Sequence, residues 1–272
     1  MSEGYEALRR GAAWLDLSAR GRFLVRGRDR ARLLHNVTSN EIKKLAPGSG
    51  CYAFMLTPQG RIQADLNLFC FADHFLIDTE PELRQKVPQL ILKFKVADQV
   101  ELDDVTEQTA AIGVEGPSAD TIKLPDAHLA APITVTGQPG FRIYCTRDEM
   151  AGLVREIEAA GAAAATAEDA RIVRIENGKP RYGEDILETS LPQETGQMQA
   201  VSFTKGCYLG QEIVERIRAR GHVNRQLVRL EIDGSELPTP GKQTIGGREA
   251  EVTSAVYSPE LGKVIALAYV RE

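Results

Sequence analysis

The alternation of apolar and polar residues predicts strands in the first part of the chain. The clearest pattern runs from Arg61 to Phe71, where every second residue from Ile62 to Cys70 is apolar. Asp65 therefore lies on the polar face of this strand, while Cys70 points to the core. A second alternating stretch at residues 21–27 leads into a helical pattern that opens at Asp29. A strand followed by a helix is thus expected near the start.

The middle of the chain alternates between strand and helix patterns. Pro81 starts a helical stripe that Pro88 should kink or divide into two segments. The expected elements that follow are a strand, a strand pair and a helix, at residues 109–116, 133–137, 140–148 and 148–160. Thr166 and Asp169 then form a weak capping box before another helix. This alternation indicates an α+β fold class.

The last part of the chain has a different pattern. After Gly221, short alternating segments separated by Gly and Pro predict a small all-β module. We therefore divide the chain into an N-terminal α+β subdomain, a central α+β subdomain with a crossing loop, a short segment with its helix, and a C-terminal β-barrel module, at residues 1–106, 107–204, 205–225 and 226–272.

Composition excludes several functional classes. The 272 residues carry a net charge of 33 − 38 = −5, which argues against nucleic-acid binding as the main function. The start has no apolar leader pattern, and the hydrophobic run Val264–Val270 is too short to span a membrane. We therefore expect a cytoplasmic protein without a membrane-spanning segment. The four cysteines show no metal-binding spacing, and no metal site is predicted. Cys70 and Cys145 lie in apolar rows and should be buried, whereas Cys51 is left open.

The segment Lys205–Glu212, KGCYLGQE, carries the most distinctive chemistry. Helical spacing from Leu209 onward and a stop at Gly221 predict a helix with Cys207 at its N-terminal entry. The helix macrodipole and the Lys205 ammonium would stabilise a thiolate there, which predicts a reactive sulfur. The alternative is that Cys207 is a small core residue beside a tight turn.

KGCYLGQE followed by RIRARGH resembles the signature of the YgfZ family, relatives of the glycine-cleavage T-protein in the GcvT-like superfamily. Further matches run nearly from end to end, including DLSARGRFLVRGRD, HNVTSNE, RIENGKPRYGEDI and LPQETG. The resemblance implies a multi-subdomain fold around a central channel that binds tetrahydrofolate or a one-carbon-substituted folate. It also implies a role in iron-sulfur cluster maturation or repair, with iron-sulfur client or assembly proteins as partners.

The resemblance also suggests site residues. The T-protein's folate-facing aspartate lies in a motif that GRIQADL resembles, which implies Asp65, or leaves Ala64 there if the register differs. Its pterin-binding glutamate lies in a Pro-x-Glu motif, which implies Glu194, and a carboxylate can accept two N–H groups of a pterin. Without the resemblance, Glu194 would be a solvated loop acid and Asp65 a partner of Arg61. The remaining folate-binding candidates come from the KGCYLGQE segment: Tyr208, Gln211 and Glu212.

Three functions compete at this point. The first is a folate-binding accessory protein for iron-sulfur assembly, in which Cys207, Lys205 and Asp65 carry the chemistry. The second is a folate-dependent aminomethyltransferase in which Asp65 polarises the folate amine and a lipoyl protein delivers the aminomethyl group. The third is a non-catalytic, folate-responsive binding module with a structural Cys207. The KGCYLGQE segment favours the first, because the resemblance places it in the accessory branch.

Overall fold

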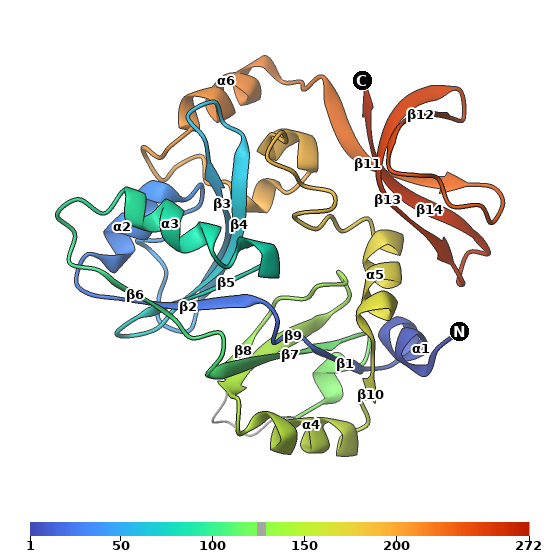
Figure 1. Ribbon diagram of the computed structural model, residues 1–272, viewed down its shortest axis with the longest axis horizontal. Coiled ribbons are helices and arrows are strands. Elements are labelled where there is room, and N and C mark those ends of the chain that lie inside the picture. Colours follow the sequence, from blue (N-terminus) through green and yellow to red (C-terminus); the bar gives the residue numbers. More distant parts are fainter. Residues whose placement is uncertain (124–128, 272) are drawn as a thin grey trace. The chain divides into compact units, whose positions relative to one another are not determined.

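The computed structural model describes residues 1–123 and 129–271 (Figure 1). The chain folds into two compact units, and each unit is assembled from stretches that are far apart in the sequence. Unit 1 contains residues 1–19, 107–180 and 228–270, and unit 2 contains mainly residues 20–106 and 181–227. The division into four consecutive segments stays a prediction.

Unit 2 is built on a five-stranded antiparallel sheet of order β3-β4-β5-β2-β6. The strands are β2 (Gly21–Arg26), β3 (Gly50–Leu56), β4 (Ile62–Cys70), β5 (Phe75–Thr79) and β6 (Glu101–Asp104). The apolar row of β4, from Ile62 to Cys70, joins the hydrophobic core of this unit, so the expected face of the strand is confirmed. Asp65 lies on the opposite face.

Two helices add their apolar sides to the same core: α2 (Arg30–Val37) through Leu33 and Leu34, and α3 (Lys86–Lys93) through Val87 and Ile91. The helical stripe that begins at Pro81 is divided into the 3-10 turn η1 (Pro81–Leu83) and α3, which confirms the expected division. Pro88 lies in the first turn of α3, where its missing N–H breaks no intrahelical bond.

The second stretch of unit 2 packs along the start of β4. It contains η3 (Pro192–Thr195), η4 (Met198–Ala200) and α6 (Gln211–Arg220). The Ile62 amide donates to the Ser190 carbonyl at 3.0 Å, and the Gln193 side-chain amide donates to the Val214 carbonyl at 2.9 Å. These bonds fix the loop before η3 to β4, and η3 to α6.

Unit 1 has a second five-stranded sheet, of order β10-β1-β7-β9-β8. Its elements are α1 (Glu3–Arg10), β1 (Ala13–Asp16), β7 (Thr109–Glu115), η2 (Ala119–Thr121), β8 (Leu129–Ala131), β9 (Gly140–Thr146), α4 (Met150–Ala159), β10 (Ala163–Ala164) and α5 (Ala167–Glu176). The capping box of Thr166 and Asp169 is present at the start of α5.

The strand expected at residues 133–137 is wrong. The Val135 and Thr136 amides donate to the buried Glu115 carboxylate at 2.7 and 2.9 Å, so this backbone folds around an acid instead of pairing in a sheet. A buried carboxylate needs such donors, and this requirement outweighs the local strand pattern.

The C-terminal strands form a four-stranded sheet of order β11-β14-β13-β12, which confirms the small all-β module. The strands are β11 (Arg225–Ile232), β12 (Gly241–Ile245), β13 (Arg248–Ser258) and β14 (Lys263–Arg271). Together with the two five-stranded sheets and their helices, this sheet confirms the α+β fold class. Within the described ranges, no helix has the length and apolar character needed to cross a membrane.

Candidate functional site

Asp65 is a buried acid in the middle of β4. Its side chain is 8% exposed, and the Tyr52 hydroxyl on β3 donates to its Oδ2 at 2.8 Å. Its backbone carbonyl accepts from the Thr79 hydroxyl at 2.7 Å. Oδ1 is buried and has no hydrogen-bond partner among residues 1–123 and 129–271. The alternative pairing with Arg61 does not occur, because that guanidinium donates to the Thr189 carbonyl.

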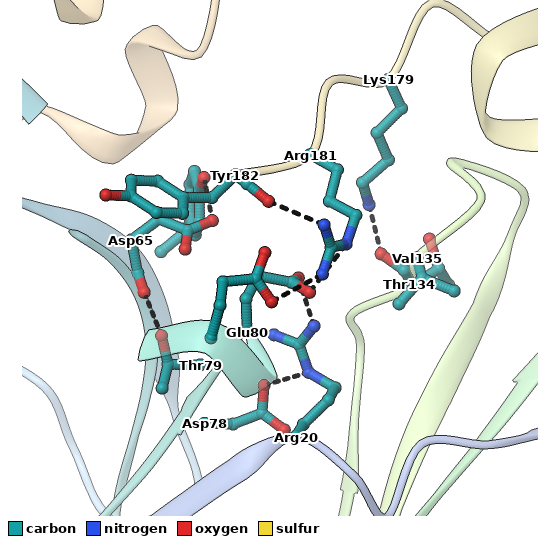
Figure 2. Close-up of polar contacts among 12 residues, drawn as sticks. Arg20, Asp65, Asp78, Thr79, Glu80, Thr134, Val135, Lys179, Arg181 and Tyr182 are labelled. Atoms are coloured by element: carbon teal, nitrogen blue, oxygen red, sulfur yellow. Dashed lines mark hydrogen bonds and ion pairs between the residues drawn. The ribbon is translucent and has the colours of Figure 1, made fainter. Parts of the chain in front are cut away.

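A network of charged side chains surrounds Asp65 (Figure 2). Arg20 donates to Asp78 at 2.7 Å and also pairs with Glu80, just beyond the end of β5. Arg181 approaches the same Glu80 at 3.0 Å and pairs with Glu82 at 2.8 Å. Glu80 therefore receives two guanidinium groups.

The environment of Asp65 favours its neutral form. Burial raises the pKa of Asp65 to about 7, the nearby Glu80 charge adds to this, and Arg20, the Tyr52 hydrogen bond and Arg181 oppose it. Burial also acts to raise the pKa of Glu80, but Arg20 and Arg181 outweigh it and hold that pKa below its ordinary value. Within this network, Asp65 is therefore the group that exchanges a proton near neutral pH.

Glu194 lies on η3 and is also buried, at 8% exposure. Its Oε2 accepts from the Leu191 amide at 3.1 Å and from Arg225 at 3.3 Å. The solvated-loop alternative is therefore wrong, since this carboxylate is buried and fixed in place through Oε2.

Lys205 has a structural role that its sequence does not reveal. Its ammonium donates to the carbonyls of His35, Thr38 and Asn40 at 2.5, 2.5 and 2.7 Å. These carbonyls lie at or beyond the C-terminal end of α2, where backbone acceptors lack helical partners. Burial lowers the pKa of Lys205 to about 8. This lysine thus caps α2.

Other residues of the KGCYLGQE segment also hold the fold together. The Tyr208 ring is buried 5.0 Å from the Lys205 ammonium, and the Gln211 side chain accepts from the Tyr208 amide at 3.3 Å. Gly210 has a φ of 83°, and a Cβ there would lie 2.5 Å from the Thr57 carbonyl. Only glycine meets both conditions, and it lets the turn before α6 rest on the β3–β4 turn. Glu212 is exposed.

Cys207 is the exposed cysteine of this segment, but it does not begin the helix. Gly210 is the N-cap of α6, three residues later, so the expected position at the helix entry is wrong. The expected support from Lys205 is also wrong, because its ammonium is held by the carbonyls after α2. The remaining reason to expect a reactive Cys207 is that reagents can reach its thiol. Cys70 and Cys145 are buried as expected, and Cys51 is half-buried.

Comparisons with known proteins give a consistent result. The model of the GCVT N-terminal domain matches residues 1–125, and that of the glycine cleavage T-protein C-terminal barrel domain matches residues 225–272. An aminomethyltransferase from Symbiobacterium thermophilum is 30% identical over 305 residues, which cover 98% of this chain and 80% of that protein. The chain belongs to the glycine cleavage T-protein family. A second family member, the aminomethyltransferase of Rubrobacter xylanophilus, is 29% identical and matches 98% of this chain and 78% of its own length.

A solved structure shows the same T-protein fold. The crystal structure of the glycine cleavage system aminomethyltransferase T from Bartonella henselae superposes with a TM-score of 0.86 at 18% identity. The match covers 99% of this chain and 81% of that one. The GcvT-like fold inferred from the sequence is thereby confirmed.

Sequence reasoning missed the residues that lie around Asp65 in this T-protein family member. Tyr52, Arg20, Glu80 and Arg181 come from separate parts of unit 2. One signal was present: the strand FLIDTE carries acids directly after an apolar run, and an acid in a buried strand needs a cation or a proton.

Exposure alone predicts how the cysteines react. In the folded protein, iodoacetamide should label Cys207 first, because reagent access controls thiol alkylation and the other thiols are wholly or partly buried. Burial also raises the pKa of Cys51 to about 12, which suppresses its thiolate. Mass-spectrometric mapping of partial labelling ranks the four thiols. Faster labelling of Cys51 or Cys70 would contradict this order.

Proposed function

We propose that this T-protein family member binds tetrahydrofolate or a one-carbon derivative and acts in folate-dependent one-carbon transfer of the aminomethyltransferase type. The observation that carries the proposal is Asp65, a buried carboxyl with Oδ1 left without a partner among the described residues. A buried polar atom without a partner in a native protein calls for an explanation, and a ligand that completes it is one. The names of the relatives, which are aminomethyltransferases, support the same reaction.

Glu194 is the group that we assign to the pterin ring. Arg225 and the Leu191 amide fix Oε2, so Oε1 can accept an N–H from the aminopyrimidinone edge. The Tyr208 hydroxyl is buried without a hydrogen-bond partner in the described part of the chain, so it can donate to the same ligand. Gln211 positions Tyr208 through its backbone, and Glu212 is free to meet an exposed part of the folate.

Glu194→Gln should weaken tetrahydrofolate binding by about 1–3 kcal/mol, because the amide accepts fewer pterin N–H groups and loses the charge. Isothermal titration calorimetry at neutral pH measures this loss. Glu156→Gln on α4 is the control, since Glu156 is exposed and lies in unit 1, outside the proposed folate residues of unit 2, and we expect wild-type affinity. Equal binding by wild type and Glu194→Gln would remove Glu194 from the pterin site.

A second candidate function is favoured by Cys207. An exposed thiol lies in a segment whose neighbours Lys205, Tyr208 and Gly210 are all fixed by structural contacts. This arrangement supports the accessory role in iron-sulfur cluster assembly or repair that the YgfZ resemblance implies, in which the thiol faces a client or assembly protein.

One pair of assays separates the two functions. With an aminomethyl-lipoyl protein and tetrahydrofolate, an aminomethyltransferase gives methylenetetrahydrofolate, ammonia and the dihydrolipoyl protein at a robust rate. An accessory protein instead restores the activity of a [4Fe–4S] enzyme in a host that lacks its own homologue, and Cys207→Ser loses that restoration. Turnover in the first assay together with a silent Cys207→Ser would reject the accessory role.

A further inference from the structure

The two arginines near Asp65 are fully committed to other acids. Arg20 is shared by Asp78 and Glu80, and Arg181 is shared by Glu80 and Glu82. Arg20 and Arg181 are also the first residues of the two chain segments that build unit 2. Glu80 therefore forms an ion pair with one arginine from each segment (Figure 2).

Asp65 makes no ion pair among the residues that the structure describes. The groups that act on it are the Tyr52 hydroxyl on β3, Glu80 after β5, Arg20 before β2, and Arg181 and Tyr182 on the loop that precedes η3. Tyr182 itself donates to the Gln63 carbonyl at 2.8 Å, so its hydroxyl hydrogen is engaged.

Hydrogen bonding separates Asp65 from the neighbouring acids. Asp78 receives Arg20, and Glu80 receives both Arg20 and Arg181, whereas Asp65 has the Tyr52 hydroxyl as its side-chain partner among the described residues. A buried carboxyl that lacks a paired cation favours its protonated form.

We propose that Glu80 is a positioning residue for Asp65: by holding Arg20 and Arg181 it keeps both guanidinium groups from pairing with Asp65 and leaves this carboxyl able to carry a proton. The consequence for a ligand rests on the proposed folate function. The protonated Asp65 carboxyl donates a hydrogen bond to an amine nitrogen of the bound folate, and the ionised carboxylate accepts one from the corresponding N–H. Glu80 itself touches no substrate.

The carboxyl titration of ligand-free protein tests this directly, by ¹³C NMR with Asp65→Asn to assign the signal. Glu80→Gln removes a neighbouring negative charge and frees both arginines, so the Asp65 midpoint should fall by on the order of one pH unit. Arg181→Gln removes a positive charge and should move the midpoint upward. General damage to the fold would move both variants in the same direction, so opposite shifts identify electrostatic control.

Two further variants serve as controls. Glu82→Gln lies on the outer side of Arg181 and should leave the Asp65 midpoint within a few tenths of a unit, and Glu80→Asp keeps the charge and should restore most of the wild-type midpoint. Thermal unfolding confirms that each variant folds. If Glu80→Gln does not fold, the Arg181→Gln shift alone decides.

An unchanged Asp65 midpoint in folded Glu80→Gln, or in Arg181→Gln where that variant decides, overturns the role of Glu80. The affinity for tetrahydrofolate is measured separately, by titration calorimetry at several pH values. Shifted midpoints without folate binding would reject the folate function and leave the role of Glu80 intact. Folate binding with unshifted midpoints would reject the role of Glu80 and leave the folate function intact.

Discussion

Replacing Lys205 by alanine should lower the free energy of unfolding by about 3 kcal/mol, because it leaves several buried acceptors without a donor. The ammonium donates to the His35, Thr38 and Asn40 carbonyls, and the His35 carbonyl lies in the last turn of α2. The change also removes the lysine stem and the charge beside the Tyr208 ring. Chemical denaturation at pH 7 with the slope held common to both proteins measures the loss.

Lys44→Ala is the matched control. Lys44 lies on the loop that follows α2, but its side chain is 77% exposed and its ammonium is 3.7 Å from the Glu41 carboxylate. Exposed pairs of this kind contribute about 0–1 kcal/mol, so this variant should unfold almost as wild type does. Lys205→Met keeps the apolar stem and should fall between the two. A loss for Lys205→Ala no greater than that for Lys44→Ala would show that the cap is dispensable.

Local patterns predicted β2, α2, β4, α3 and α6 of unit 2, but not β3, β5 or β6. Alternation placed β4 and its polar face, and the proline-containing stripe predicted the division that leaves Pro88 in the first turn of α3, where proline is tolerated. The pattern at residues 133–137 gave the wrong answer, because the Glu115 carboxylate that organises this backbone is about twenty residues away. A contact of that kind leaves no trace in a local window.

The candidate site shows the same limit. The resemblance pointed to Asp65 and Glu194, and the structure finds both carboxyl groups buried. Neither the resemblance nor the spacing indicated that Glu80 would carry two arginines, since those arginines are separated by about 160 residues. Lys205 was misinterpreted for the same reason: its nearest chemical neighbour in sequence is Cys207, but its partners are about 165–170 residues earlier.

Asp65→Asn should raise the free energy of unfolding at pH 8 by about 4 kcal/mol relative to wild type. The pKa of Asp65 is about 7 in the folded protein, where burial is the largest cause, and its ordinary value is 3.8. The folded state therefore binds this proton more tightly than the unfolded chain. Its contribution to stability is fully present below about pH 4 and is lost as the pH rises through 7. Asparagine stays neutral and can still accept from the Tyr52 hydroxyl.

Urea denaturation of both proteins from pH 4 to pH 8 measures this difference, which should be near zero at pH 4 and grow toward pH 8. Asp103→Asn is the control, because Asp103 is an exposed partner of Arg26 whose replacement should leave the wild-type dependence on pH unchanged. Parallel curves for wild type and Asp65→Asn would mean that Asp65 is ionised throughout, held by a cation in place of a proton. Diverging curves would mean that this strand carries an acid at a measurable cost in stability, which is what a residue retained for hydrogen bonding to a ligand requires.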